Sequence, residues 1–279
     1  MKTLCLLRKT TSLFLTVVML MTCISAWATT ETATVEVDAS SADQILTVEA
    51  IDIDVNMPAG TQIIGLDVTT NGHEADVDVQ KGIDVNGDNA PSGSCGVNIG
   101  MEGDNGTADI SVGKDVSVTD SKHSSGVFVN VSGQTGNDVT IDIDGSVKAK
   151  TTDSTSATGY PGSSGVEIYP AGSTDTHVLV DIGEDISAEG GRSSVGLRIS
   201  SEEMGVVKGS TVDVLVGGDV SAKSANTADG YATGVYMESV GTEQETLQIG
   251  GMVLAQSTGK ATGIFAGFPG IGKNAGCLL

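Results

Sequence analysis

Apolar residues recur along this chain at fixed positions within a repeat of 29 to 39 residues. The clearest phrase reads glycine, apolar, any residue, apolar. It begins at Gly65, Gly96, Gly126, Gly165, Gly196, Gly234 and Gly263. The steps between these glycines are 31, 30, 39, 31, 38 and 29 residues. A period in this range is typical of stacked repeat architectures.

Two shorter apolar groups precede each glycine phrase at a spacing that does not change over six copies. In the first copy, Val77 and Val79 form one group, and Ile83 and Val85 form the next. Alternation with a period of two predicts β-strands, and Val and Ile favour them. Gly, Asp, Ser and Lys fill the step between the groups, and these residues indicate a turn. Each repeat is therefore expected to hold three short strands.

Three short strands that each bury one face cannot close a core alone, but copies stacked at about 4.8 Å form a continuous apolar column. We predict an all-β, right-handed, three-sided parallel β-solenoid of about six to seven rungs. One buried ladder is expected to contain Val79, Val112, Ile143, Ile182, Val216 and Ile249. A β-sandwich ranks second, because a sandwich does not need the same residue class at the same phase. We interpret the repeated glycine as a corner residue with unusual backbone angles.

The N-terminus has the pattern of a secretory signal. Lys2, Arg8 and Lys9 precede an apolar core at 12–24, and Ala26-Trp27-Ala28 is a small-x-small cleavage site. We assign residues 1–28 to a signal peptide, 29–49 to an N-terminal cap, 50–266 to the solenoid and 267–279 to a flexible tail. The signal predicts an extracellular or cell-surface location.

The net charge of the chain argues against some classes of binding partner. Without the signal, eleven basic residues face 36 acidic ones, a formal charge of −25. Because phosphate binding needs a basic surface, we expect no nucleic acid partner. No later segment is apolar for long enough to span a membrane, so no membrane insertion is expected. Aromatic residues make up 3% of the chain, which argues against an aromatic-lined sugar cleft.

We expect no catalytic residues, no cofactor and no metal site. His73, His123 and His177 fall at three different phases of the repeat, whereas metal ligands must converge. Cys95 and Cys277 stand about five rungs apart, roughly 24 Å at the spacing of stacked strands. We therefore favour two free thiols, or pairing between molecules, over one disulfide.

Four carboxylates share an outward phase in the sequence: Asp54, Asp78, Asp142 and Asp181. We expect Asp54 to lie one rung from Asp78, and Asp142 one rung from Asp181. Such pairs suit Ca²⁺, or the acid and base of a glycosidase, but a solvated acidic face is the favoured interpretation. A solenoid lyase or glycosidase that acts on extracellular polysaccharide remains the alternative function.

The connection between the second strand and the glycine phrase varies most in length. Its steps are 12, 9, 17, 9, 13 and 9 residues. Insertions in a repeat array collect on one flank, which is often the binding face. The two longest connections carry Tyr160 and Tyr231. We predict that these two tyrosines contact a protein or glycan partner.

The segments Val216–Ala222 and Ala232–Tyr236 resemble repeats of bacterial secreted β-solenoid proteins, among them autotransporter passengers and adhesin-like cell-surface proteins. The resemblance covers residues 50–266. It implies an extended, non-catalytic stalk that adheres to cells, to matrix or to neighbouring bacteria.

A solenoid also exposes strand edges at its two ends, which natural chains must cover. The glycine-rich tail is too short to cap the C-terminal end well, so we expect end-to-end self-association there.

Overall fold

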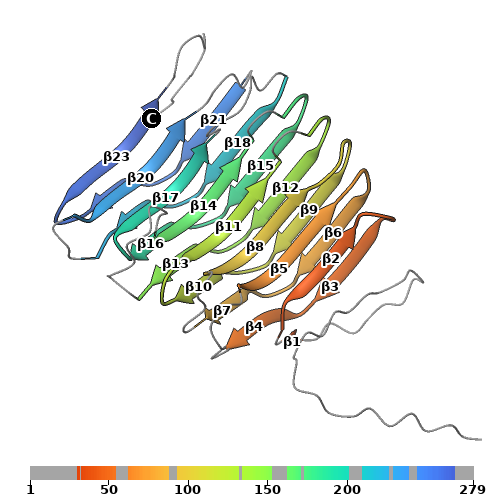
Figure 1. Cartoon of the computed structure of the whole chain (residues 1–279), viewed down its shortest axis with the longest axis horizontal. Helices are drawn as coiled ribbons and strands as arrows, with labels where there is room; N and C mark the ends of the chain where they lie inside the picture. The colour runs from red at the N-terminus through yellow and green to blue at the C-terminus, as the bar shows by residue number, and fades with distance from the viewer. Residues whose placement is uncertain are drawn as a thin grey trace, which may run out of the picture.

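The computed structural model describes residues 30–31, 33–54, 62–87, 93–131, 134–152, 162–170, 173–200, 209–225, 229–238 and 244–267. Within these ranges the chain forms strands and turns and no helix. The predicted signal peptide, residues 268–279 of the predicted tail, Tyr160 and Cys277 lie outside them. Figure 1 shows the strands in three sheets, with successive coils side by side.

The strands belong to three sheets, which we call A, B and C. Sheet A contains β1 (Thr30–Glu31), β4 (Ala50–Asp54), β7 (Ile83–Gly87), β10 (Val116–Asp120), β13 (Val147–Thr151), β16 (Ile186–Gly190), β19 (Val220–Lys223) and β22 (Val253–Gln256). Sheet B contains β2 (Val35–Ala39), β5 (Ile63–Thr70), β8 (Ser94–Met101), β11 (Ser124–Asn130), β14 (Ser163–Tyr169), β17 (Ser193–Ser200), β20 (Tyr231–Glu238) and β23 (Lys260–Gly267). Sheet C contains β3 (Gln44–Val48), β6 (Glu74–Val79), β9 (Thr107–Val112), β12 (Asp138–Ile143), β15 (His177–Ile182), β18 (Thr211–Val216) and β21 (Gln244–Ile249).

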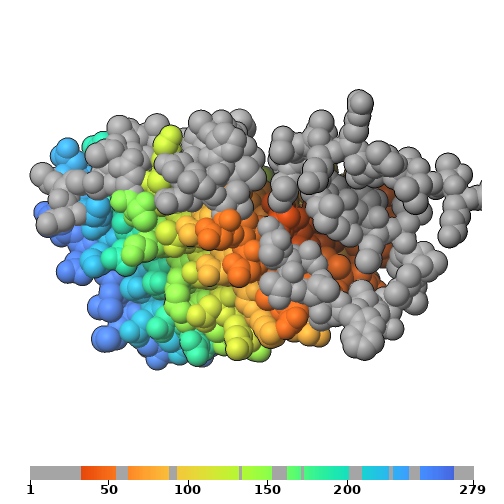
Figure 2. All heavy atoms as spheres, turned by 90° about the horizontal axis from the view of Figure 1, so that it is seen from below, coloured from red at the N-terminus to blue at the C-terminus, as the bar shows by residue number. Residues whose placement is uncertain are grey.

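Every pairing between neighbouring coils is parallel and in register. Along sheet A, Ile83 pairs with Val116, and Val116 pairs with Val147. The chain runs from sheet C to sheet A to sheet B in each coil, so the three strands predicted for each repeat are the three sides. Figure 2 shows the coils following one another in sequence order along the long axis. The predicted all-β solenoid of three parallel sheets is confirmed, with about six turns.

The core is the column of inward side chains that runs through all coils. In the predicted ladder, Val79, Ile143 and Ile182 are fully buried, and Val216 is 3% exposed. Ile249, in the last coil, is only partly buried against the same core. The ladder is therefore confirmed, and it opens where no further coil follows among the described residues.

The glycine column has a different cause from the one the sequence suggested. None of its seven members has a positive φ. A Cβ built on Gly126 would lie 2.5 Å from the carbonyl oxygen of Gly165 and would also overlap Val147. The pairing skips the glycine, since Ser125 pairs with Ser164 and Val127 with Val166. Glycine is required because the backbones of adjacent coils approach closely where the strand bends.

The segment assigned to an N-terminal cap contributes strands to all three sheets. Strand β2 pairs with β5, β3 pairs with β6, and the two-residue β1 pairs with β4. Residue 50 therefore does not mark a change of architecture. The repeat begins before the first glycine phrase, because Val35 occupies the column of Leu66 although Thr34 precedes it instead of a glycine.

Candidate functional site

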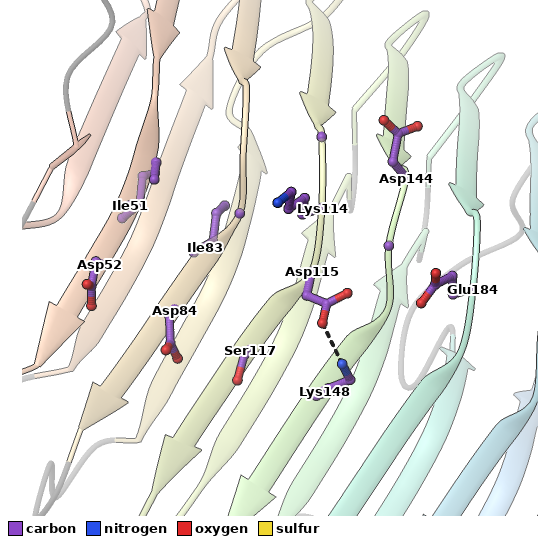
Figure 3. Close-up of a pocket in the computed structure, with 14 residues that line it drawn as sticks. Ile51, Asp52, Ile83, Asp84, Lys114, Asp115, Ser117, Asp144, Lys148 and Glu184 are labelled. Carbon is purple, nitrogen blue, oxygen red and sulfur yellow. Dashed lines mark hydrogen bonds and ion pairs between the residues drawn. The ribbon is translucent and has the colours of Figure 1, made fainter.

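A shallow groove crosses five successive coils at the corner where sheet C passes into sheet A. We call it the axial groove; its volume is about 690 Å³. Strands β4, β7, β10 and β13 and the turns before β7, β10, β13 and β16 line it (Figure 3). Its charged lining consists of Asp52, Asp84, Lys114, Asp115, Asp144, Lys148 and Glu184.

Register places one row of groove side chains on the outer face of sheet A. Asp52 pairs with Asp84, Asp84 with Ser117, and Ser117 with Lys148. Because alternate residues of a strand face opposite sides, all four point away from the core. Figure 3 shows the row on successive strands. This row is thus acidic toward the N-terminal coils and carries a lysine farther along.

Electrostatics differ between the two parts of the groove. Partial burial and the nearby charges of Asp52 and Asp54 raise the pKa of the Asp84 carboxyl. Burial alone would also raise the pKa of Asp115, but a hydrogen bond from Lys148 and one from the Ser146 backbone N–H lower it overall. A cation bound near Asp84 would relieve the repulsion among the carboxylates of Asp84, Asp52 and Asp54. Asp115 already has a cation beside it, the ammonium group of Lys148.

The stacked carboxylates follow the prediction for one pair and contradict it for the other. Asp142 and Asp181 are register partners on the outer face of sheet C. Asp54 instead pairs with Asn86 in sheet A, while Asp78 lies opposite Ser111 in sheet C. The prediction failed because Ile51-Asp52-Ile53-Asp54 alternates in a way that suits either strand type.

Two of the three histidines lie close to carboxylates, His177 on the outer face of sheet C and His73 in the turn before β6. His177 places Nδ1 3.2 Å from Asp138 and Nε2 3.5 Å from Asp213. His73 Nδ1 lies 3.3 Å from Asp43. Across the part of the chain that the structure describes, no group of three or more His, Cys, Asp or Glu side chains is arranged to hold a metal ion.

Aromatic rings and one arginine form a continuous stack on the outer face of sheet B. We call this set the aromatic ladder: Phe128, Tyr169, Arg198, Tyr236 and Phe265. The ring centroids of Phe128 and Tyr169 are 5.3 Å apart, and those of Tyr236 and Phe265 are 4.9 Å apart and nearly parallel. The Arg198 guanidinium lies 5.6 Å from the Tyr169 ring and 5.5 Å from the Tyr236 ring. The ladder joins five strands.

Sequence reasoning missed this ladder. Four of its members occupy the variable position of the glycine phrase, so aligning the repeats by column would have shown them in line. Beside the ladder, Glu167 is 4% exposed and accepts a hydrogen bond from the Tyr169 hydroxyl at 2.9 Å. Because each member contacts a member on a neighbouring coil, the ladder first serves to hold adjacent coils together.

Of the two tyrosines predicted to contact a partner, the structure describes only Tyr231. Tyr231 begins β20, is 39% exposed and pairs with Ser193 and Lys260. Its exposure suits a contact role, but a joint contact surface with Tyr160 stays a prediction.

Cys95 is a free thiol at 3% exposure, and burial raises its pKa, so it is poorly reactive.

The comparisons with known proteins do not indicate a function for this chain. No protein-family model, no curated protein and no solved structure matches this chain. Within the described ranges, no helix is long and apolar enough to cross a membrane.

Proposed function

We propose that this chain is a secreted or cell-surface β-solenoid with a structural and adhesive role and no catalytic function. The observation that carries the proposal is the axial groove, an open, preformed surface that crosses five coils. An elongated groove along a stack of coils suits an extended partner.

The frame around the groove supports this role. Asp52, Asp84 and Lys148 stand on paired strands of sheet A, such as β7 between β4 and β10, and the other charged side chains of the lining stand on the tight turns before such strands. Side chains on paired strands are held more precisely than side chains on loops. A partner therefore meets a surface that needs little ordering on binding, which lowers the entropic cost of association.

The lining favours an extended protein segment with basic side chains. Asp52 and Asp84 are register partners, and the negative charge around Asp84 opposes its own ionisation. A lysine or arginine of the partner stabilises these carboxylates by charge and by hydrogen bonds. The described lining of the groove holds no aromatic side chain, which makes a glycan the less favoured partner.

The test is a binding screen of the purified protein on immobilised extracellular-matrix proteins and glycans, followed by mutation of the groove. We expect Asp52→Asn with Asp84→Asn to weaken binding to the best protein partner at least tenfold and to reduce its salt dependence. The matched control is Asp76→Asn with Asp109→Asn, which makes the same charge change on sheet C. Equal losses in both variants, or binding to glycans alone, would contradict the groove assignment.

The raised pKa of Asp84 also favours a second candidate, a lyase or glycosidase acting on extracellular polysaccharide. A carboxyl that keeps its proton more readily than usual is suited to general-acid chemistry. The test is the release of reducing ends or unsaturated products from a panel of polysaccharides. Turnover that disappears in Asp84→Asn would replace the adhesive proposal with the enzymatic one.

A further inference from the structure

The two ends of the solenoid differ in burial. At the N-terminal end, Val37 and Val48 are 5% and 4% exposed although they belong to terminal strands. At the C-terminal end, Ile264 and Val253 are only partly buried, whereas their register partners one coil earlier are fully buried. Val35 and Leu46 are also only partly buried at the N-terminal end, so both ends are open, but the C-terminal end keeps fewer of its core side chains buried.

The C-terminal edge also exposes large apolar side chains. Met252, Leu254 and Phe265 are 61%, 47% and 43% exposed. A Cβ built on Gly263 meets nothing within 4 Å, whereas the other six glycines of its column are closely covered. Among the described residues, β23 pairs with β20 on one side and has no strand on the other. Such an edge is a template for further pairing.

Charge distinguishes between the two ends of a second copy as possible binding partners of the C-terminal edge. Residues 30–54 contain seven acidic residues and no basic residue, whereas residues 244–267 contain only Glu245 and Lys260. Two acidic N-terminal ends repel each other, and the N-terminal edge exposes one large apolar side chain, Ile45, against three at the C-terminal edge. Two C-terminal ends meet without net charge and with apolar surface on both sides.

We propose that the C-terminal end of the solenoid binds the C-terminal end of a second copy of this chain, related by a two-fold axis. An axis perpendicular to the solenoid and through the middle of β23 pairs this strand with the partner's β23 in antiparallel orientation. The same rotation exchanges the other two sides, so β22 faces the partner's β21. All three edges are then paired, and the closed symmetry stops growth at a dimer.

This inference does not depend on the adhesive function, because the groove and the C-terminal edge are different surfaces. The first test is sedimentation equilibrium of the purified protein over a wide concentration range. We expect a reversible monomer–dimer equilibrium with no larger species. Ala261→Lys with Ala266→Lys adds two charges to exposed positions of β23 and should weaken the dimer at least tenfold.

The matched control is Thr140→Lys with Ser187→Lys, which adds the same charge on outer faces of β12 and β16. This variant should dimerise like the parent, and circular dichroism should show that both variants are folded. A monomer at all concentrations overturns the proposal and points to residues 268–279 as the cover of the edge. Open-ended oligomers overturn it in favour of head-to-tail stacking.

A cysteine near the proposed axis gives a second, geometric test. In a Cys277→Ser background, Gly263→Cys places a thiol in open space near the middle of β23. Opposed residues of antiparallel strands lie about 4.5 to 5.5 Å apart, within reach of a disulfide. We expect mild oxidation to give a covalent dimer of this variant and none of Asp43→Cys at the other end. A disulfide only in a mixture of the two variants would show head-to-tail contact and overturn the two-fold arrangement.

Discussion

At the scale of single residues, what a position tolerates depends on the coil stacked upon it. The sequence showed that Gly126 and Gly263 share a phase, but not that the glycine column lies against the next backbone. That requirement arises from the distance between coils, which single-sequence periodicity does not contain. Inward positions such as Ile182 were predictable, because alternation alone assigns their face.

The glycine column gives a prediction with an internal control. Gly126→Ala forces its new methyl group against Gly165 and Val147, and we expect a loss of about 1 to 3 kcal/mol in the free energy of unfolding. In the monomer, Gly263→Ala adds the same methyl group to open space and should change stability by less than about 1 kcal/mol. Urea unfolding of both variants measures the difference. Equal effects would contradict the close packing of the column.

The buried ladder gives a second prediction. Ile182→Asp places a carboxyl at a fully buried site without a partner, and it should cost several kcal/mol. The neighbouring change Asp181→Asn alters an outward side chain and should leave the melting temperature nearly unchanged. Thermal unfolding followed by circular dichroism compares them. If the two variants melt together, the inward register of β15 is wrong.

At the scale of strands, the three strands of each coil were predictable from the sequence. Which outward side chains contact one another across coils was not. The spacing of Val77, Val79, Ile83 and Val85 identifies sheets C and A because packing repeats it in each coil. The aromatic ladder and the axial groove depend on which outward residues become neighbours across coils, and that follows from register. The strands before residue 50 were missed because they lack the glycine phrase.

The aromatic ladder predicts a specific contribution from Arg198. Arg198→Met keeps an apolar side chain but removes the charge between Tyr169 and Tyr236. We expect a loss of about 1 to 2 kcal/mol, the range for a cation shielded between rings. The exposed Arg192 provides the control, and Arg192→Met should have little effect. A similar change in the melting temperature of both variants would argue against a stabilising cation–π stack.

At the scale of the whole molecule, the excess of acid should make stability depend on pH. Burial and neighbouring carboxylates raise the pKa values of Asp84, Asp109 and Asp142 in the folded protein. The folded state therefore holds these protons more tightly than the unfolded state. The stability they contribute is fully present below the ordinary aspartate pKa and is lost as the pH rises through the raised values.

We accordingly expect a higher melting temperature at about pH 4.5 than at pH 7. Asp43 and Asp115 have lowered pKa values, so their contribution is lost below the ordinary aspartate pKa and the curve turns down in stronger acid. Asp109→Asn with Asp142→Asn should flatten the rise. Removing two exposed acids elsewhere, with Glu102→Gln and Asp175→Asn, should flatten it less. An equal effect would assign the pH dependence to net charge alone.

The constant register across connections of unequal length has a consequence for how such a chain can change over time. Three residues join β10 to β11, and eleven join β13 to β14. Yet Asp120 pairs with Thr151, and Ser124 pairs with Ser163. A corner of this kind accepts inserted sequence without disturbing the coils above and below it. Natural variation, or the deliberate grafting of foreign peptides, can therefore change the sequence and length of the connections between sheets A and B while the stacked strands stay the same.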